Sequence, residues 1–278
     1  MIARRAAALL LLLVSAPVAA AGDACPQGGD PAVGPLPGGI GPADFGAVPE
    51  VCGTTEAALR LRGALLVASS MPDYYGSIVG AATLRGRYQL AERSSLSVAA
   101  DVFAYRYVNN ANLASQGASA GPATLGFQQT IALGAATVSA VHARVLLPLD
   151  TARQSGIETG LELGAGIALH AGSRLVVDGG VALAAPIDIV GGQTHLRLDP
   201  IALAEAWLRL RPWVALGAGA NVRVEAAPDF GLTTVAPRLS ARFAIRRRFW
   251  MALLVELPVA GSDRTDLIAG LHAGFAPD

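Results

Sequence analysis

The chain has 278 residues, of which 53% are hydrophobic and 15% are charged, and its 21 basic residues balance its 21 acidic ones. A formal net charge of zero offers no basic patch of the kind that nucleic acids bind, so we expect no nucleic-acid partner. After the N-terminus no apolar run is long enough for a membrane-spanning helix, so the hydrophobicity must be distributed in another pattern.

The first 21 residues have the three parts of a secretory signal peptide. Met1–Arg5 is basic, Ala6–Val14 is apolar, and Val18–Ala21 supplies small residues for cleavage. The alternative, a retained membrane anchor, fits less well because the apolar stretch is short for a span. We therefore predict an exported chain with a cleaved signal peptide over residues 1–21.

Residues 22–53 are rich in glycine and proline and show no periodicity, which predicts an irregular periplasmic extension. Whether this extension plugs the rest of the protein or forms a simple leader stays open. Its two cysteines, Cys25 and Cys52, predict a disulfide because the count is even and the chain is exported. A lipoprotein with an acylated Cys25 is the alternative, but it would leave Cys52 without a partner.

From residue 54 to residue 278, apolar and polar residues alternate with the period of two that is typical of β-strands. Most of the strands are long enough to cross a bilayer, which takes about 9–11 residues. The twelve predicted strands are Ala58–Ser69, Ser77–Ala91, Ser95–Val108, Ala123–Gly134, Ala136–Pro148, Ile157–His170, Arg174–Pro186, His195–Leu210, Trp213–Glu225, Thr234–Arg246, Phe249–Val259 and Thr265–Ala276.

The connections between these strands alternate between short and long. Glu92–Ser94, Ala171–Ser173 and Arg211–Pro212 are short, whereas Asn109–Ser119 is expected to be the largest loop. Short turns on one side and long loops on the other are typical of outer-membrane barrels. We predict an all-β fold, a transmembrane antiparallel up-and-down β-barrel of about 12 strands with periplasmic N- and C-termini. A soluble β-sandwich is the alternative, and it leaves the sorting of the loops unexplained.

One face of the predicted strands is apolar and the other carries the charges. An Arg facing lipid near the bilayer centre costs about 2–4 kcal/mol, so we expect the charged face to line the lumen. Arg85 and Arg87 are expected to approach Asp101, and Arg144 is expected to approach Glu158 and Glu162. The predicted lumen-lining residues are Arg60, Arg62, Arg85, Arg87, Asp101, His142, Arg144, Glu158, Glu162, Asp178, Arg197, Asp199, Glu205, Arg209, Arg223, Arg238, Arg242 and Glu256.

Four aromatic residues of the apolar face, Tyr88, Phe243, Phe249 and Phe275, lie beside short turns or the C-terminus. They predict an interfacial girdle at the periplasmic end.

In the last strand, Leu267, Ala269, Leu271, Ala273 and Phe275 alternate with polar or small residues. This strand resembles the C-terminal strand of Gram-negative outer-membrane β-barrel proteins. The resemblance implies a location in the outer membrane, contact with its lipid, and recognition by the barrel assembly machinery. The chain departs from the pattern because Ala276-Pro277-Asp278 follow the aromatic residue.

A barrel with a charged lumen has two expected functions. The charges either line a narrow, porin-like passive pore for small solutes, or pair across the lumen and seal it, leaving a structural or loop-presenting protein. An outer-membrane hydrolase is the third class, but His142, His170, His195 and His272 lack a nucleophile and an orienting group at matching positions. The sequence therefore predicts no enzyme activity, no cofactor and no metal site, and leaves the oligomeric state open.

Overall fold

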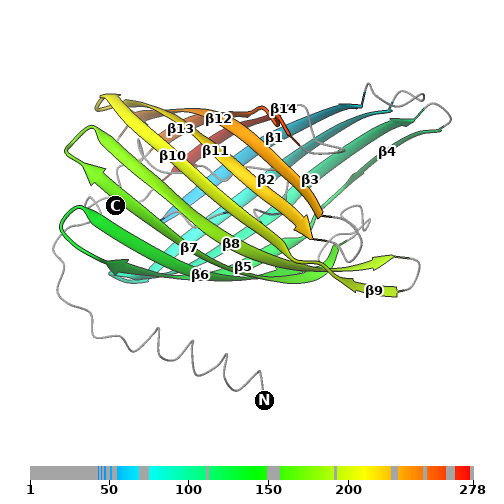
Figure 1. Ribbon diagram of the computed structural model, residues 1–278, viewed down its shortest axis with the longest axis horizontal. Helices are drawn as coiled ribbons and strands as arrows, with labels where there is room; N and C mark the ends of the chain where they lie inside the picture. Colours follow the sequence, from blue (N-terminus) through cyan, green and yellow to red (C-terminus); the bar gives the residue numbers. More distant parts are fainter. Residues whose placement is uncertain are drawn as a thin grey trace, which may run out of the picture.

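The computed structural model describes Ala43, Phe45, Ala47, Val51 and residues 55–68, 75–110, 113–148, 157–190, 193–226, 231–246, 249–260 and 267–275. The predicted signal peptide and both cysteines lie outside this described part. All the named elements are strands of a single sheet (Figure 1). They are β1 (Glu56–Ala68), β2 (Tyr75–Ala91), β3 (Ser94–Asn110), β4 (Leu113–Ser119), β5 (Ala123–Ala132), β6 (Thr137–Leu147), β7 (Ile157–Ala171), β8 (Leu175–Val190), β9 (Gln193–Leu196), β10 (Asp199–Arg211), β11 (Val214–Ala226), β12 (Gly231–Arg246), β13 (Phe249–Glu256) and β14 (Leu267–Phe275).

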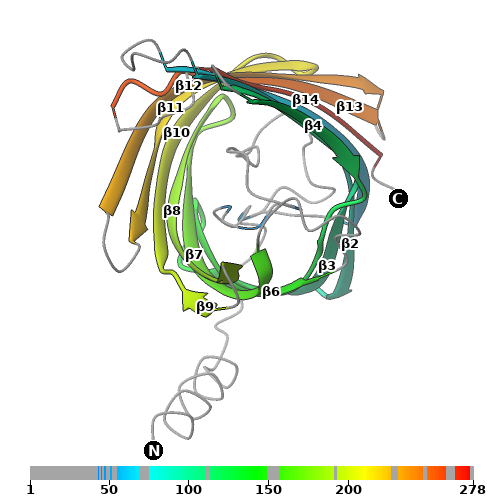
Figure 2. The same cartoon turned by 90° about the vertical axis from the view of Figure 1, so that its right-hand side faces the viewer.

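The sheet closes on itself into a barrel of twelve antiparallel strands (Figure 2). The ring consists of all the named strands except β4 and β9, so β3 pairs with β5 and β8 pairs with β10. The other strands of the ring pair with their neighbours in sequence. The ring closes where β14 pairs with β1, from Ala57↔Phe275 to Leu65↔Leu267. Closure leaves no edge in the ring itself, whereas the extensions β4 and β9 each pair with one strand only. The predicted all-β barrel and its strand number are therefore confirmed.

The two faces of the wall differ as the alternation predicts. Outward-facing Leu161 and Leu239 are 62% and 63% exposed, whereas inward-facing Glu162 and Arg238 are 1% and 2% exposed. A barrel wall only one strand thick can bury charged residues this completely only if they pack inside it. Within the described residues, no helix is both long and apolar enough to span a bilayer.

The connections at one end of the barrel are all short, whereas those at the other end range from the two residues that separate β3 from β4, and β8 from β9, to longer loops. Two residues separate β2 from β3. Two residues, Pro212 and Trp213, separate β10 from β11. In the turn between β7 and β8, Gly172 has φ +70°, a conformation that a glycine adopts without steric cost. We call this end the short-turn end and the opposite one the long-loop end.

The predicted largest loop, Asn109–Ser119, is wrong. β3 continues to Asn110, and β4 returns against it from Asn110↔Leu113 to Ala104↔Ser119. β5 continues the same register against β3, from Ala100↔Ala123 to Ser94↔Gln129. The sequence did not reveal β4 because its small and polar residues, LASQGAS, lack a repeated apolar face.

The predicted strand His195–Leu210 is interrupted. β9 and β10 both pair with β8 in one continuous register, from Val190↔Gln193 to Asp199↔Ala184. The ladder breaks opposite Pro186, whose nitrogen carries no hydrogen to donate, although Pro186 still accepts a hydrogen bond from Arg197 N at 3.0 Å. Pro122 lies at the equivalent break between β4 and β5.

Candidate functional site: the charged inner face

The inner face carries ion pairs distributed around the ring of strands. Most of the predicted lumen-lining residues lie on this face and are buried or half-buried. The side chain of Glu158 lies outside the described residues. Because both signs occur on neighbouring strands, the charges form local clusters, which the following paragraphs take in turn.

Asp101 of β3 is the centre of the first cluster. Its carboxylate is 3% exposed and accepts hydrogen bonds from Arg62 Nη2 at 2.6 Å and Thr83 Oγ1 at 2.5 Å. Its backbone donates to Pro122 O at 3.2 Å and accepts from Gly121 N at 2.7 Å. Arg62 reaches Asp101 across β2, which lies between their strands.

The expected contact of Asp101 with Arg85 and Arg87 stays a prediction. Arg85 Nη2 lies 3.8 Å from Glu56 Oε1, and on the β2–β3 ladder Arg85 is opposite Ala99, two residues from Asp101. Beyond Asp101, β2 and β3 shift register between Ala82↔Phe103 and Thr83↔Asp101, which is a β-bulge. The extra residue in β3 turns Phe103 outward, where it is 49% exposed, although the alternation placed it on the charged face.

Glu162 of β7 forms the second cluster. Its Oε1 accepts a hydrogen bond from Arg144 Nη1 at 2.9 Å and lies 2.7 Å from His142 Nε2. Glu162 is 1% exposed and His142 is 5% exposed. The expected approach of Arg144 to Glu162 is therefore observed.

Arg238 of β12 lies between two buried carboxylates. Its Nε is 3.4 Å from Glu205 Oε1, and its Nη1 is 3.6 Å from Glu256 Oε1. Ser240 Oγ donates a hydrogen bond to Glu205 Oε1 at 2.6 Å. The sequence analysis did not include Ser240 among the lumen-lining residues, because a serine on a strand does not by itself indicate which face it occupies or what it contacts.

Asp199 of β10 forms the fourth cluster. It accepts hydrogen bonds from Arg197 Nε at 2.9 Å and Arg223 Nη2 at 3.1 Å. Elsewhere on the inner face, the guanidinium carbon of Arg242 lies 4.4 Å from the ring centroid of Trp250, which is cation–π geometry. Arg60, Arg87 and Asp178 are also buried, whereas Arg209 is half-buried.

The inner face also contacts four residues that precede the first strand. Ala43, Phe45, Ala47 and Val51 are each at most 5% exposed. We call these four residues the lumen anchors. They belong to the stretch 22–53, for which the sequence analysis left open whether it plugs the barrel or forms a simple leader.

The wall holds the backbone of the lumen anchors with polar side chains. Ala43 N donates to Asp101 Oδ2 at 3.0 Å, and Thr124 Oγ1 donates to Ala43 O at 2.8 Å. Arg144 Nη1 donates to Ala47 O at 3.1 Å. Asp101 and Arg144 therefore serve both the wall and the anchors.

The side chains of Phe45 and Val51 pack into apolar parts of the inner face. Phe45 lies in a cluster with Leu146, Ala182, Ala184 and Ile201. The wall has a glycine, Gly160, where the ring approaches it, and a Cβ at this position would come within 2.7 Å of Phe45 Cζ. Val51 packs in a second cluster, whose larger members include Val138, Trp207, Trp250 and Leu254.

The outer face is apolar and carries the predicted aromatic residues near the short-turn end. Tyr88 and Phe249 are 63% and 49% exposed, and the rings of Phe249 and Phe275 lie 4.9 Å apart. Trp213, which the sequence analysis omitted, is 57% exposed at the same end.

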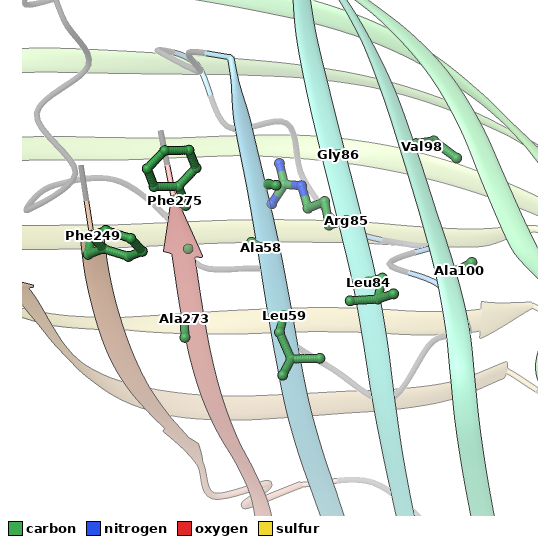
Figure 3. A pocket seen from close by; sticks show the side chains of 12 residues that line it. Ala58, Leu59, Leu84, Arg85, Gly86, Val98, Ala100, Phe249, Ala273 and Phe275 are labelled. Atoms are coloured by element: carbon green, nitrogen blue, oxygen red, sulfur yellow. The ribbon is translucent and has the colours of Figure 1, made fainter. Parts of the chain in front are cut away.

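Beside the two phenylalanines, the wall has a shallow hollow of about 600 Å³ (Figure 3). Small residues, among them Ala57, Gly86 and Ala273, line it where other outward positions carry leucine. The hollow is open to the outside of the barrel and does not contribute to the charged inner face.

Comparison with known proteins identifies the architecture. No family model matches the chain, and no curated protein matches it. Among solved structures, an outer-membrane channel from Pseudomonas putida F1 superposes with a TM-score of 0.64 at 17% identity, covering 85% of this chain and 99% of that one. The NanC porin superposes with a TM-score of 0.51 at 8% identity, covering 79% of this chain and 100% of the porin. The chain has the fold of an outer-membrane β-barrel. These two solved structures are an outer-membrane channel and a porin.

Proposed function

We propose that this protein is a narrow, passive channel for small solutes in the outer membrane of a Gram-negative bacterium. The observation that carries the proposal is the closed barrel with an apolar outside and charged clusters on the inside. The similarity to an outer-membrane channel and a porin supports it. The signal peptide predicted over residues 1–21 fits export to that membrane.

The charges supply the chemistry of such a path. Guanidinium and carboxylate groups replace part of the hydration shell of a passing polar solute, and the sign of the charges that remain accessible sets ion preference. Arg223 and Arg197 are the most accessible members of the ion pairs described above, with side chains 23% and 24% exposed. Both lie against Asp199, so we expect this cluster to meet solutes.

The proposed lumen is narrow because the lumen anchors occupy part of it. Phe45 and Val51 belong to clusters of inner-face residues contributed by β6, β7, β8, β10, β11 and β13. A twelve-stranded barrel lies between small filled barrels and wide porins in diameter. Side chains and lumen anchors together leave room for small solutes only.

We place the short-turn end and both termini in the periplasm, as is usual for barrels of this type. Tyr88, Phe243, Phe249 and Phe275 then form the predicted girdle at the periplasmic interface.

The test is a recording of the purified protein in planar bilayers. We expect discrete current steps, and we expect Arg223→Glu to move the reversal potential in a salt gradient toward cation preference. Arg93→Glu, in the turn between β2 and β3, is the matched control and should leave the reversal potential unchanged. A folded wild-type protein that never conducts would refute the channel.

The second candidate is a sealed barrel that serves the membrane structurally or presents its loops. The extensive pairing of Asp101, Glu162, Asp199 and Glu205 favours it, because fully paired charges bind each other in preference to water. In that case, current steps appear only after a pair is broken, for example in Glu162→Gln.

A further inference from the structure

We propose that the inner wall is a built binding site for a peptide, that the stretch carrying the lumen anchors is its ligand, and that this ligand leaves the site reversibly. The inference rests on the proposed function, since the consequence of release is a wider path. It concerns four described residues, Ala43, Phe45, Ala47 and Val51, and the wall residues that contact them.

The first observation is that the wall binds peptide groups specifically. Both backbone groups of Ala43 are satisfied by side chains of the wall, its N–H by Asp101 and its C=O by Thr124. Arg144 then binds the C=O of Ala47. Hydrogen bonds to charged groups are about twice as strong as neutral ones, so Asp101 and Arg144 are the main polar contacts.

The second observation is a niche that fits one aromatic side chain. Phe45 lies between the polar contacts at Ala43 and Ala47, among Leu146, Ala182 and Ala184. The wall offers small residues here and lacks a side chain at Gly160, where a Cβ would clash with the ring. Phe45 is the sole aromatic residue of the sequence from 22 to 53.

The third observation is the backbone conformation of Ala43. Its φ is +45°, in the left-handed region that residues with a Cβ seldom adopt. Such a conformation persists only where the surroundings over-determine it, and it is typical of ligand clamps. Asp101 and Thr124 provide that constraint from opposite sides of the residue.

Among the described residues, the charged groups of the wall that bind the lumen anchors also have partners within the wall. Asp101 keeps Arg62 and Thr83 when Ala43 leaves, and Arg144 keeps Glu162, whereas the hydroxyls of Thr124 and Thr130 lose their acceptors at Ala43 and Val51. The charges of the wall therefore stay satisfied in both states, and the apolar contacts of Phe45 and Val51 dominate the balance. Phe45 is thus the residue that decides occupancy.

The first arm of the test measures occupancy without reference to conduction. Chymotrypsin cleaves after phenylalanine, and Phe45 at 5% exposure is protected while the site is occupied. Thr124→Val removes one hydrogen bond to Ala43, and should speed cleavage after Phe45 about tenfold. Ser240→Ala removes a buried hydroxyl from the opposite wall and is the matched control, with no change expected. Equal cleavage rates for both variants and the wild type would overturn the proposal.

The second arm links occupancy to the path. Phe45→Ala should raise the ratio of open to blocked time in bilayers about 100-fold, since truncation of a buried phenylalanine is this costly to the bound state. A synthetic peptide with the sequence of residues 41–51 should restore the block in trans, and the same peptide with alanine in place of phenylalanine should not. Phe249→Ala, on the outer face, is the control for the loss of an aromatic side chain.

The outcomes separate the two proposals. If cleavage responds to Thr124→Val but no variant conducts, the peptide site stands and the channel function fails. If the wild type conducts and Phe45→Ala conducts identically, or if both peptides block equally, the reversible ligand fails while the channel stands. Heat-modifiable gel migration shows in each case that the variant barrel is folded.

Discussion

Removing the charge of Glu162 should destabilise the barrel more than any change of similar size on its surface. In Glu162→Gln, the side chain keeps its shape but can no longer neutralise Arg144, whose side chain is only 10% exposed. Breaking a buried ion pair by removing one partner costs about 3–5 kcal/mol, because the remaining charge stays buried. At 1.36 kcal/mol per factor of ten, the unfolding equilibrium should shift by about two to four orders of magnitude.

The assay is urea unfolding of the protein in lipid vesicles, followed by tryptophan fluorescence. Glu92→Gln, in the exposed turn after β2, makes the same chemical change without a buried partner and should stay within about 0.5 kcal/mol of the wild type. The double variant Arg144→Met/Glu162→Leu removes both charges and should be more stable than Glu162→Gln, since no unpaired charge remains.

A free energy for Glu162→Gln within 0.5 kcal/mol of the wild type would refute the reasoning. It would mean that water reaches Arg144 freely, and hence that this cluster lies in an open, wet part of the lumen. The same measurement therefore bears on how much of the inner face is sealed.

Three further predictions concern the membrane, the orientation and the cysteines. Leu239→Arg, at a 63% exposed outward position of β12, should lower the free energy of unfolding in lipid by about 2–4 kcal/mol. Asn221→Arg, on the inner face of the adjacent β11, should lower it less. Equal losses measured by urea unfolding would mean that the faces are assigned wrongly. A cysteine at Asp229 should react with an impermeant reagent on intact cells and one at Arg93 should not, and the reverse pattern would invert the proposed orientation. Alkylation followed by mass spectrometry should modify Cys25 and Cys52 only after reduction, and modification without reduction would disprove the predicted disulfide.

The wall of the barrel could be predicted from the sequence because one physical constraint acts on every strand. A side chain that faces lipid must be apolar, so alternation in stretches such as β7 and β10 reports directly which face is outside. The same alternation placed Glu162, Asp199 and Glu205 on the inner face, and the structure shows all three buried there.

The partners of the inward charges were harder to predict, because they depend on register and on strands that are not adjacent. Asp101 of β3 accepts a hydrogen bond from Arg62 of β1, across the intervening strand β2. Pairing of this kind depends on side-chain length and barrel curvature, and the alternation of apolar and polar residues gives no information about how these two factors combine.

Two of the wall's prolines show how a sequence signal can be present and still be missed. Pro122 and Pro186 each lie where a ladder is interrupted while its register continues. A proline in a strand pattern predicts a lost ladder hydrogen bond, but not whether the strand resumes beyond it. Here it resumes both times, which extends the hairpins of β3 and β8 past the rest of the rim (Figure 1).

The lumen anchors mark the limit of inference from periodicity. Glycine and proline exclude regular structure from residues 22–53, and an aperiodic stretch has no face from which a contact could be inferred. The single aromatic residue of that stretch, Phe45, was the available signal, because a large aromatic side chain is expected to be buried against another part of the protein. The small residues Gly160, Ala182 and Ala184 of the inner wall leave the space that Phe45 fills. They lie on the adjacent strands β7 and β8 and form a niche only once the barrel has closed, so the sequence alone did not show that they belong together.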